Sequence, residues 1–254
     1  MAHVVQAGLW GLLAGSALLL GAVLGFAWRV PQKVIAAVMA FGAGVLLSAV
    51  SFELLGEAYD EAGLGPAVIG TLGGGVAYTV GNLWLARRGA RHRKRSGHSS
   101  SSRSQPSEAE QRGSGTALAL GALLDGVPES AVIGVSLLKG GAVSLVTVAA
   151  VFISNVPEGL SSSAGMKRSG RSKGYVFGVW TAIAAVCTVS AVFGYTVVGA
   201  FSPAVIAAVT AVAAGAILAM TADTMIPEAF EDTPSAIGLI TVCGFLVSFA
   251  LSHA

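Results

Sequence analysis

The sequence predicts an all-α integral membrane protein with eight transmembrane helices. Of its 254 residues, 54% are hydrophobic and 11% are charged, whereas soluble domains carry about 25% charged residues. The mean hydropathy is +0.76. The 34 glycines also suit membrane helices, because small residues let neighbouring backbones approach closely.

Apolar segments long enough to cross a bilayer, for which about 20 residues are needed, occur eight times in the chain. They are residues 6–28, 33–56, 65–86, 115–138, 141–166, 174–199, 202–228 and 235–253. We expect the first to be a retained helix and not a signal peptide. Its start, MAHVVQAG, has no Lys or Arg, and no A-x-A cleavage site follows it.

The basic residues predict the orientation. Lys139 is the only one of the 15 Lys and Arg residues that lies in an even-numbered connection between the predicted helices. By the positive-inside rule, the odd-numbered connections are cytoplasmic and both termini lie outside. The acidic second connection, with Glu57, Asp60 and Glu61, then also lies outside. We therefore expect a multi-pass protein of the plasma membrane, in contact with the lipid bilayer.

The chain divides into three parts. Residues 1–87 hold predicted helices one to three, residues 88–114 form a loop, and residues 115–254 hold helices four to eight. The loop is basic, rich in Ser and without apolar periodicity, which predicts a disordered cytoplasmic segment. Its charge would fix the topology and contact anionic lipid. Metal capture by His92 and His98 is the alternative, which the strongly cationic surroundings disfavour.

Two copies of a short polar pattern interrupt the fourth and fifth apolar segments, at Asp125-Gly-Val-Pro-Glu129 and Ser154-Asn-Val-Pro-Glu158. The spacing of four places the first and last side chains of each copy on one helix face. The proline removes a backbone donor and clashes with an earlier carbonyl, which it frees. Ionisable groups at membrane depth cost about 2.5–3.5 kcal/mol each and normally face a partner, a cavity or an ion. The predicted metal ligands are Asp125, Glu129, Ser154, Asn155 and Glu158.

This predicted ligand set offers only oxygen. Imidazole suits Zn, Cu, Fe and Ni, whereas carboxylate and carbonyl oxygen suit Mg, Ca and Mn. All four histidines lie in the tails or in the loop, so the sequence predicts weak discrimination in favour of zinc. Without an ion, three clustered carboxylates cannot all stay ionised cheaply, so metal binding is expected to release protons.

The second and seventh apolar segments resemble each other. Residues 44–58 align with residues 215–229 at an offset of 171, from glycine to Glu-Ala in both. Since the two helices cross in opposite senses, the alignment predicts an inverted repeat, typical of secondary transporters. Helices one to three would repeat as helices six to eight around a central pair, helices four and five. Four carboxylates lie towards the ends of the two aligned helices: Glu53, Glu57, Asp223 and Glu228. At such positions we expect ion pairing or snorkelling towards the membrane surface. Asp223 is the deepest of the four in its apolar segment.

At these motifs the sequence resembles the ZIP family of divalent-metal transporters. That family has eight helices, outward termini, a long variable loop after helix three and His-Asn-x-Pro-Glu-Gly motifs on helices four and five. The second helix, at Phe41-Gly-Ala-Gly-Val-Leu-Leu, and the seventh, at Asp223-Thr-Met-Ile-Pro-Glu228, also look like those of the family. The resemblance covers nearly the whole chain outside residues 88–114.

The resemblance implies transmembrane transport of a divalent metal cation, zinc or a related first-row metal such as Fe or Mn. It implies that helices one, four, five and six carry the metal against a scaffold of the other four, usually in a homodimer. The metal would be the transported substrate. We accordingly expect no permanent cofactor, no enzymatic activity and no nucleic-acid partner.

The chain departs from the family motif at metal-binding positions. Asp125 and Ser154 stand where the family has His, and no Asp or Glu lies between Glu158 and Asp223, where relatives often have a carboxylate on helix six. A second hypothesis therefore stays open, a ZIP-like membrane protein that binds or senses metal without transporting it. A third, an intramembrane aspartyl protease using Asp125 and Asp223, lacks the Gly-x-Gly-Asp pattern of that class and leaves the duplicated Pro-Glu motif unexplained.

Overall fold

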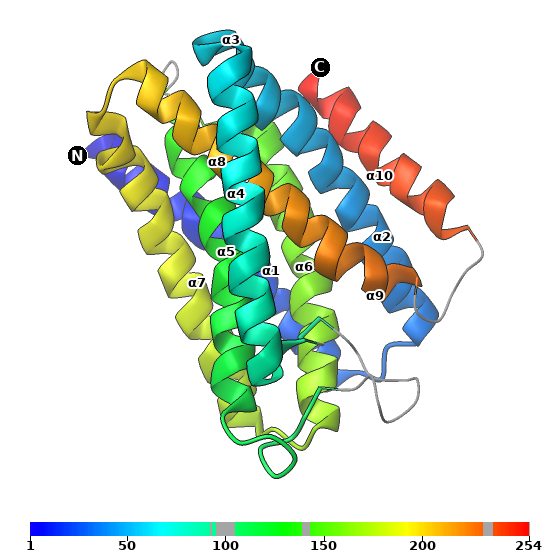
Figure 1. Cartoon of the computed structure of the whole chain (residues 1–254). Coiled ribbons are helices and arrows are strands. Elements are labelled where there is room, and N and C mark those ends of the chain that lie inside the picture. Colours follow the sequence, from blue (N-terminus) through cyan, green and yellow to red (C-terminus); the bar gives the residue numbers. More distant parts are fainter. Residues whose placement is uncertain (92, 95–104, 139–142, 231–235, 254) are drawn as a thin grey trace.

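The computed structural model describes residues 1–91, 93–94, 105–138, 143–230 and 236–253. Within these ranges the chain forms helices and turns and no strand (Figure 1), which confirms the predicted all-α class. The α-helices are α1 (Ala2–Ala27), α2 (Gln32–Ala49), α3 (Gly56–Ala62), α4 (Leu64–Leu85), α5 (Ser114–Ser136), α6 (Leu145–Arg168), α7 (Lys173–Thr196), α8 (Pro203–Met220), α9 (Ile226–Phe230) and α10 (Ile237–Ser252).

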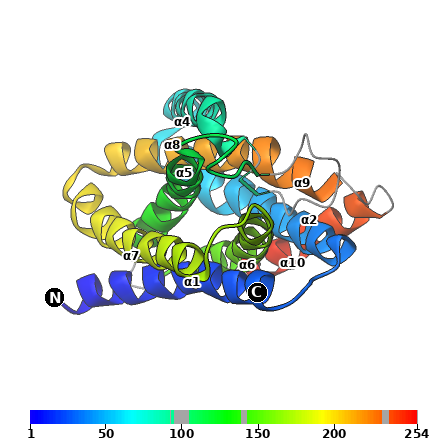
Figure 2. The ribbon, with the colours of Figure 1, turned by 90° about the horizontal axis from the view of Figure 1, so that it is seen from below.

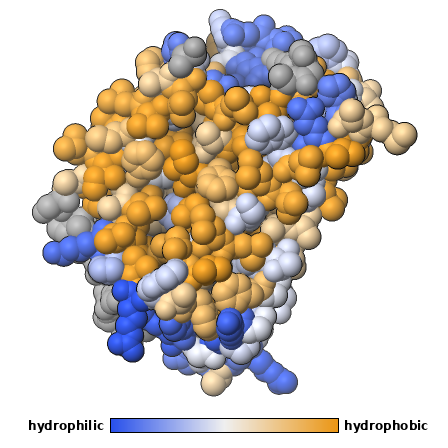
Figure 3. Space-filling view, turned by 180° about the vertical axis from the view of Figure 1, so that it is seen from behind, coloured by the Kyte–Doolittle hydropathy of each residue, from blue (hydrophilic) through white to orange (hydrophobic). Residues whose placement is uncertain are grey.

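The helices indicate a multi-pass membrane protein. In the described part of the chain, seven continuous helices are long and apolar enough to span a bilayer, and α10 is apolar but shorter. Large hydrophobic side chains point outwards from the bundle, among them Leu9, Ile69 and Leu239. The space-filling view shows a broad apolar surface between two hydrophilic ends on one face of the molecule (Figure 3). Seven predicted spans are thus matched in length and position, and the eighth coincides with α10.

The bundle places α5 and α6 in its interior. Seen along the bundle, these two helices lie between α1 on one side and α8 on the other, with α4 outermost (Figure 2). Both chain ends lie at one end of the bundle, and the described parts of the α1–α2, α4–α5 and α6–α7 connections lie at the opposite end (Figure 1). The helices that carry the Pro-Glu motifs are therefore well shielded from the surroundings.

Glycines bring four pairs of helices into backbone contact. In each pair, a glycine of either helix faces a carbonyl oxygen of the other, and an added Cβ atom would lie 1.8 to 2.2 Å from that oxygen. Such short distances leave no room for a side chain, as expected where membrane helices pack through small residues. The contacts are α4–α8 (Gly74 to Val212, Gly215 to Thr71), α2–α10 (Gly44 to Thr241, Gly244 to Phe41), α1–α6 (Gly21 to Val156, Gly159 to Leu18) and α5–α7 (Gly134 to Ala191, Gly194 to Ala131).

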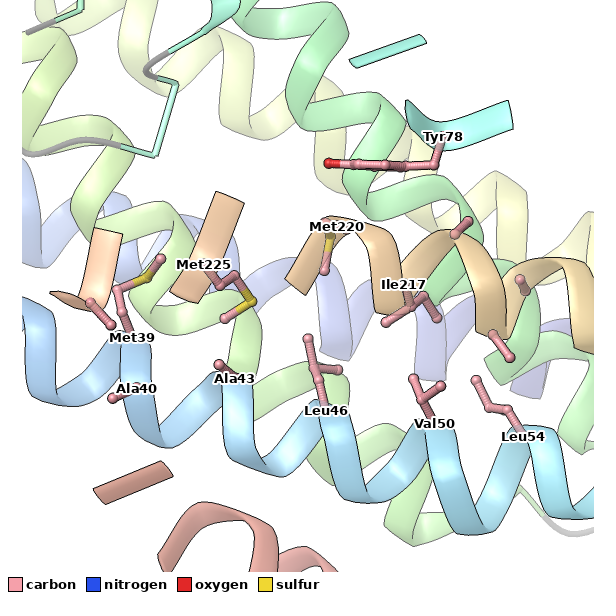
Figure 4. Close-up of a cluster of buried hydrophobic side chains, with 14 of the residues drawn as sticks. Met39, Ala40, Ala43, Leu46, Val50, Leu54, Tyr78, Ile217, Met220 and Met225 are labelled. Atoms are coloured by element: carbon pink, nitrogen blue, oxygen red, sulfur yellow. The ribbon is translucent and has the colours of Figure 1, made fainter. Parts of the chain in front are cut away.

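Besides the π-helical turn Ala86–Ala90 (η2) at the end of α4, two helices contain such a turn between α-helical segments. Val50–Leu55 (η1) joins α2 to α3, and Thr221–Met225 (η5) joins α8 to α9. Both are continuous with the helices on either side and are not breaks in them. The buried side chains of α2 and η1 face those of α8 and η5 across an apolar contact (Figure 4), formed by Met39, Leu46, Val50, Ile217, Met220 and Met225.

Candidate functional site

The five predicted ligands are all buried inside the bundle. Asp125 and Glu129 lie on α5, and Ser154, Asn155 and Glu158 lie on α6. None of them exposes more than 3% of its surface. Both helices continue through their internal prolines, Pro128 and Pro157. The sequence motif thus places three carboxyl groups in the interior of an apolar bundle, where charge needs compensation.

Two basic residues of the connection between α4 and α5 supply that compensation. The Nζ atom of Lys94 lies 2.9 Å from Oε2 of Glu158 and 3.3 Å from Oδ2 of Asp125. Arg93 donates from Nε to Oδ2 of Asp125 at 2.9 Å and from Nη2 to Oδ1 at 2.8 Å. Both basic residues are buried, at 3% exposure each. Two cations of the chain itself therefore face the predicted metal-binding carboxylates.

The burial of Arg93 and Lys94 differs from the disordered loop expected at residues 88–114. Of that segment the structure describes 88–91, 93–94 and 105–114, while both histidines, His92 and His98, lie outside the described residues. The physical reason for the difference is the charge of the site, because buried carboxylates are stable only when they are paired or hydrogen-bonded. The run of basic residues supplies suitable partners.

Arg93 also joins α4 to α5. Its Nη2 atom donates to the hydroxyl of Tyr78 at 2.6 Å, and its Nη1 atom donates to Oδ1 of Asn82 at 2.6 Å. The Tyr78 hydroxyl in turn donates to Oδ1 of Asp125 at 2.7 Å. Asn82 donates from Nδ2 to Oδ2 of Asp223 in η5 at 3.3 Å. The guanidinium group thus connects α4 to α5 directly, and Asn82 extends the network to η5.

The backbone of Arg93 and Lys94 is fixed against α6. Gln105 donates from Nε2 to the carbonyl oxygen of Arg93 at 2.9 Å and to that of Ser162 at 3.1 Å. The Ser161 hydroxyl donates to the carbonyl oxygen of Lys94 and lies 2.9 Å from Oε1 of the buried Glu228. The segment is therefore held through its main chain as well as through its charges.

The end of the same connection is anchored by Glu108. Its carboxylate accepts hydrogen bonds from Arg171 at 2.8 Å and from the backbone N–H groups of Gly115 and Gly113 at 2.8 and 2.7 Å. These bonds lower the pKa of Glu108 to about 2. The carboxylate consequently stays ionised near neutral pH, and this anchor beside the start of α5 persists there.

Glu129 is the one member of the cluster that the two cations leave without direct contact. Both of its carboxyl oxygens are buried and have no hydrogen-bond partner among the described residues. The charged groups that act on it are Glu158, Lys94 and Asp125. A buried polar group without a partner costs about 1–3 kcal/mol, and in native structures such a group calls for an explanation, for example an ion.

The other two predicted ligands bond to the backbone. The Ser154 hydroxyl donates to the carbonyl oxygen of Val151 at 3.0 Å. Asn155 donates from Nδ2 to the carbonyl oxygen of Ala14 at 2.9 Å, which links α6 to α1. Among the described residues, no group of three or more His, Cys, Asp or Glu side chains is arranged to hold a metal ion. With Lys94 in place, the carboxylates face an ammonium group.

The carboxylates of the aligned helices are placed differently from what the sequence indicates. Asp223, the deepest in its apolar segment, is exposed, whereas Glu228 is 1% exposed and lies against Ser161 of α6. Glu53 is half-buried, with Oε2 3.2 Å from the hydroxyl of Ser144. Depth along a helix axis does not say which way a side chain points, so Asp223 can be deep and still lie on an outer face.

Sequence reasoning missed four side chains of this network. Tyr78 and Asn82 carry a usable signal, since two polar residues four apart on an apolar helix share one face. Arg93 and Lys94 carry no such signal, because they belong to a longer run of basic residues and nothing in the sequence distinguishes them from their neighbours in that run.

Comparisons with known proteins do not add to these observations. The chain matches no protein-family model and no curated protein. The resemblance to ZIP transporters therefore rests on the motifs themselves.

Proposed function

We propose that the protein transports a divalent metal cation, zinc or a related first-row metal, through the carboxylate site between α5 and α6. The observation that carries the proposal is Glu129, whose two carboxyl oxygens are buried without a hydrogen-bond partner among the described residues and feel the charges of Asp125 and Glu158. A bound cation would satisfy such a group, and this supports the proposal. The metal is cargo, so the proposal includes no permanent cofactor, no enzymatic activity and no nucleic-acid partner.

A metal-binding or metal-sensing protein that does not transport is the second candidate. It is favoured by Arg93, which joins α4 to α5 through Tyr78, Asn82 and Asp125. If transport moves α5 against α4, these bonds must break. A permanent bond network here would allow binding and prevent flux.

The repeated helix crossings support the proposed inverted repeat of helices one to three and six to eight. Gly44 and Gly215 lie 171 residues apart in sequence, and the threonines they contact, Thr241 and Thr71, lie 170 apart. The π turns η1 and η5 begin 171 residues apart. The contact between α2 and α10 thus corresponds to the contact between α8 and α4. In the same way, the contact between α1 and α6 corresponds to the contact between α7 and α5. An experimental structure whose two halves failed to superpose at these crossings would contradict the repeat.

We expect a cysteine at position 100 to be labelled from the cytoplasmic side. The basic connections lie at the end of the bundle opposite both termini, which supports a plasma-membrane protein with its termini outside. Ser100→Cys would be made in a Cys243→Ser background, because Cys243 is exposed while Cys187 is buried. An impermeant thiol reagent should label inverted but not right-side-out vesicles. Labelling only from outside would contradict this orientation.

We expect Mn²⁺ and Fe²⁺ to compete effectively with Zn²⁺ for uptake into reconstituted vesicles. The reason is the all-oxygen set of Asp125, Glu129 and Glu158, since carboxylates without imidazole favour zinc less strongly. Uptake and thermal shift are measured together for each metal. Stabilisation without flux would select the non-transporting candidate, and zinc uptake unaffected by excess Mn²⁺ would contradict the oxygen-ligand site.

Light scattering in detergent tests the homodimer that we propose on the family resemblance alone.

A further inference from the structure

The carboxylate site contains a cation that belongs to the chain. We propose that Lys94 and a divalent metal ion are mutually exclusive occupants of the space between Asp125 and Glu158, so that the position of the Lys94 side chain controls metal binding. This inference rests on the proposed function, because it takes the same carboxylates as the metal site.

The first argument is positional. The Lys94 ammonium bridges a carboxylate of α5 and one of α6, at 3.3 and 2.9 Å. A metal ion bound by the same two carboxylates would lie about 2.0–2.2 Å from each ligand oxygen. Such an ion would stand between the two oxygens where Nζ now lies. The ammonium and the metal cannot both be there.

The second argument is the difference between the two basic residues. The Arg93 guanidinium makes four hydrogen bonds, two to Asp125 and one each to Tyr78 and Asn82. The ammonium of Lys94 forms ion pairs with Asp125 and Glu158. A guanidinium in a planar, multiply bonded site is fixed, whereas an ammonium on a four-carbon stem is a mobile point charge. Lys94 is therefore the residue that leaves, and Arg93 positions Asp125.

The third argument is charge. When Lys94 withdraws, the buried carboxyl groups of Asp125, Glu129 and Glu158 face Arg93 as their one remaining cation in the described part of the site. An uncompensated buried charge is strongly unfavourable. Withdrawal of Lys94 and entry of a cation thus favour each other. The main chain of the segment is tied to α6 by Gln105 and Ser161, which sets where Lys94 returns when the metal leaves.

The test compares metal affinity in Lys94→Gln with that of the parent, using Mn²⁺ and Zn²⁺ with the full-length protein in nanodiscs. If the form with Lys94 in the site is at least about 90% populated, removing it should tighten binding by about tenfold or more. Lys94→Arg, which keeps the charge, should bind metal more weakly than Lys94→Gln. Arg91→Gln removes a charge from an exposed neighbour in the same segment and should leave the affinity unchanged.

A second measurement needs no substitution at Lys94. Acylation of lysines followed by mass spectrometry reports whether each ammonium is accessible. In the parent, Mn²⁺ should increase the labelling of Lys94 and leave that of the exposed Lys33 unchanged. In Glu158→Gln, which weakens the metal site, Mn²⁺ should have a much smaller effect on Lys94.

The outcomes separate the two proposals. Equal metal affinity in the parent and Lys94→Gln, or Lys94 labelling that Mn²⁺ leaves unchanged, overturns mutual exclusion. The proposed function survives either result if Glu158→Gln still lowers the metal affinity. If neither the parent nor Lys94→Gln binds Mn²⁺ or Zn²⁺, both proposals are wrong. Metal binding that appears only in Lys94→Gln would be the strongest support for the internal cation.

Discussion

Replacing Glu158 by Gln is expected to lower the affinity for Mn²⁺ or Zn²⁺ by at least about 10–100-fold, the cost of disturbing a residue that supports a metal ligand. Glu158 is buried on α6 and its carboxylate faces the same cation as Asp125. Gln keeps the shape and one carbonyl oxygen but removes the negative charge. The fold should survive, because Lys94 keeps Asp125 as a partner.

The matched control for this prediction is Glu53→Gln. Glu53 is also a membrane-helix glutamate, but it is half-buried and lies beside Ser144 at 3.2 Å, away from the α5–α6 motifs. Metal titration and vesicle uptake are measured for both variants and the parent. Normal binding and transport in Glu158→Gln, together with loss of both in Glu53→Gln, would place the site on other helices.

Replacing Arg93 by Gln is expected to lower the free energy of unfolding by about 3–5 kcal/mol, the usual cost of removing one partner of a buried ion pair. Arg93 and Asp125 are 2.8 Å apart, with side-chain exposures of 3% and 0%. The substitution leaves Asp125 with one cation fewer and removes the bonds to Tyr78 and Asn82. Unfolding in detergent by a chemical denaturant measures the loss.

A double-mutant cycle identifies the cause of that loss. Asp125→Asn in the Arg93→Gln background removes the charge left behind, so the double variant should recover a large part of the lost stability. Arg91→Gln, an exposed basic residue two positions away, should change the stability little. A loss in Arg93→Gln no larger than that in Arg91→Gln would mean that the guanidinium contributes little to the fold.

The helices were predictable because lipid imposes a simple rule on the sequence. A helix that crosses a bilayer needs about 20 predominantly apolar residues, so the run from residue 174 to residue 199 identifies α7 without further information. The burial of Asp125, Glu129 and Glu158 was predictable for the same reason, since each lies in the middle of such a run. Local sequence was sufficient to predict helix position and burial wherever the lipid bilayer imposed the constraint.

The partners of the site were not predictable, because they come from distant parts of the chain. Lys94 pairs with a residue 64 positions away, Glu158, and nothing in its own surroundings separates it from Arg91. Glu228 and Asp223 show the same limit, because Asp223 lies deeper in its apolar segment and yet the structure buries Glu228 and exposes Asp223. The side that a helix presents depends on which neighbours it packs against, and one helix's sequence does not contain that information.

The π turns η1 and η5 allow a single helix to change neighbours along its length. One residue in excess of a regular α-helical turn rotates the following segment by about 100° around the axis. Before η1, α2 packs on α10 and α6, and after it α3 packs on α8 and α4. Likewise α8 packs on α4 and α5, and α9 packs on α2. An outright break in the helix would expose unpaired N–H and C=O groups to the hydrocarbon of the bilayer, where no water is present to form hydrogen bonds with them. An inserted residue turns the contact face with little loss of internal hydrogen bonding, so each long helix joins two separate interfaces in one crossing.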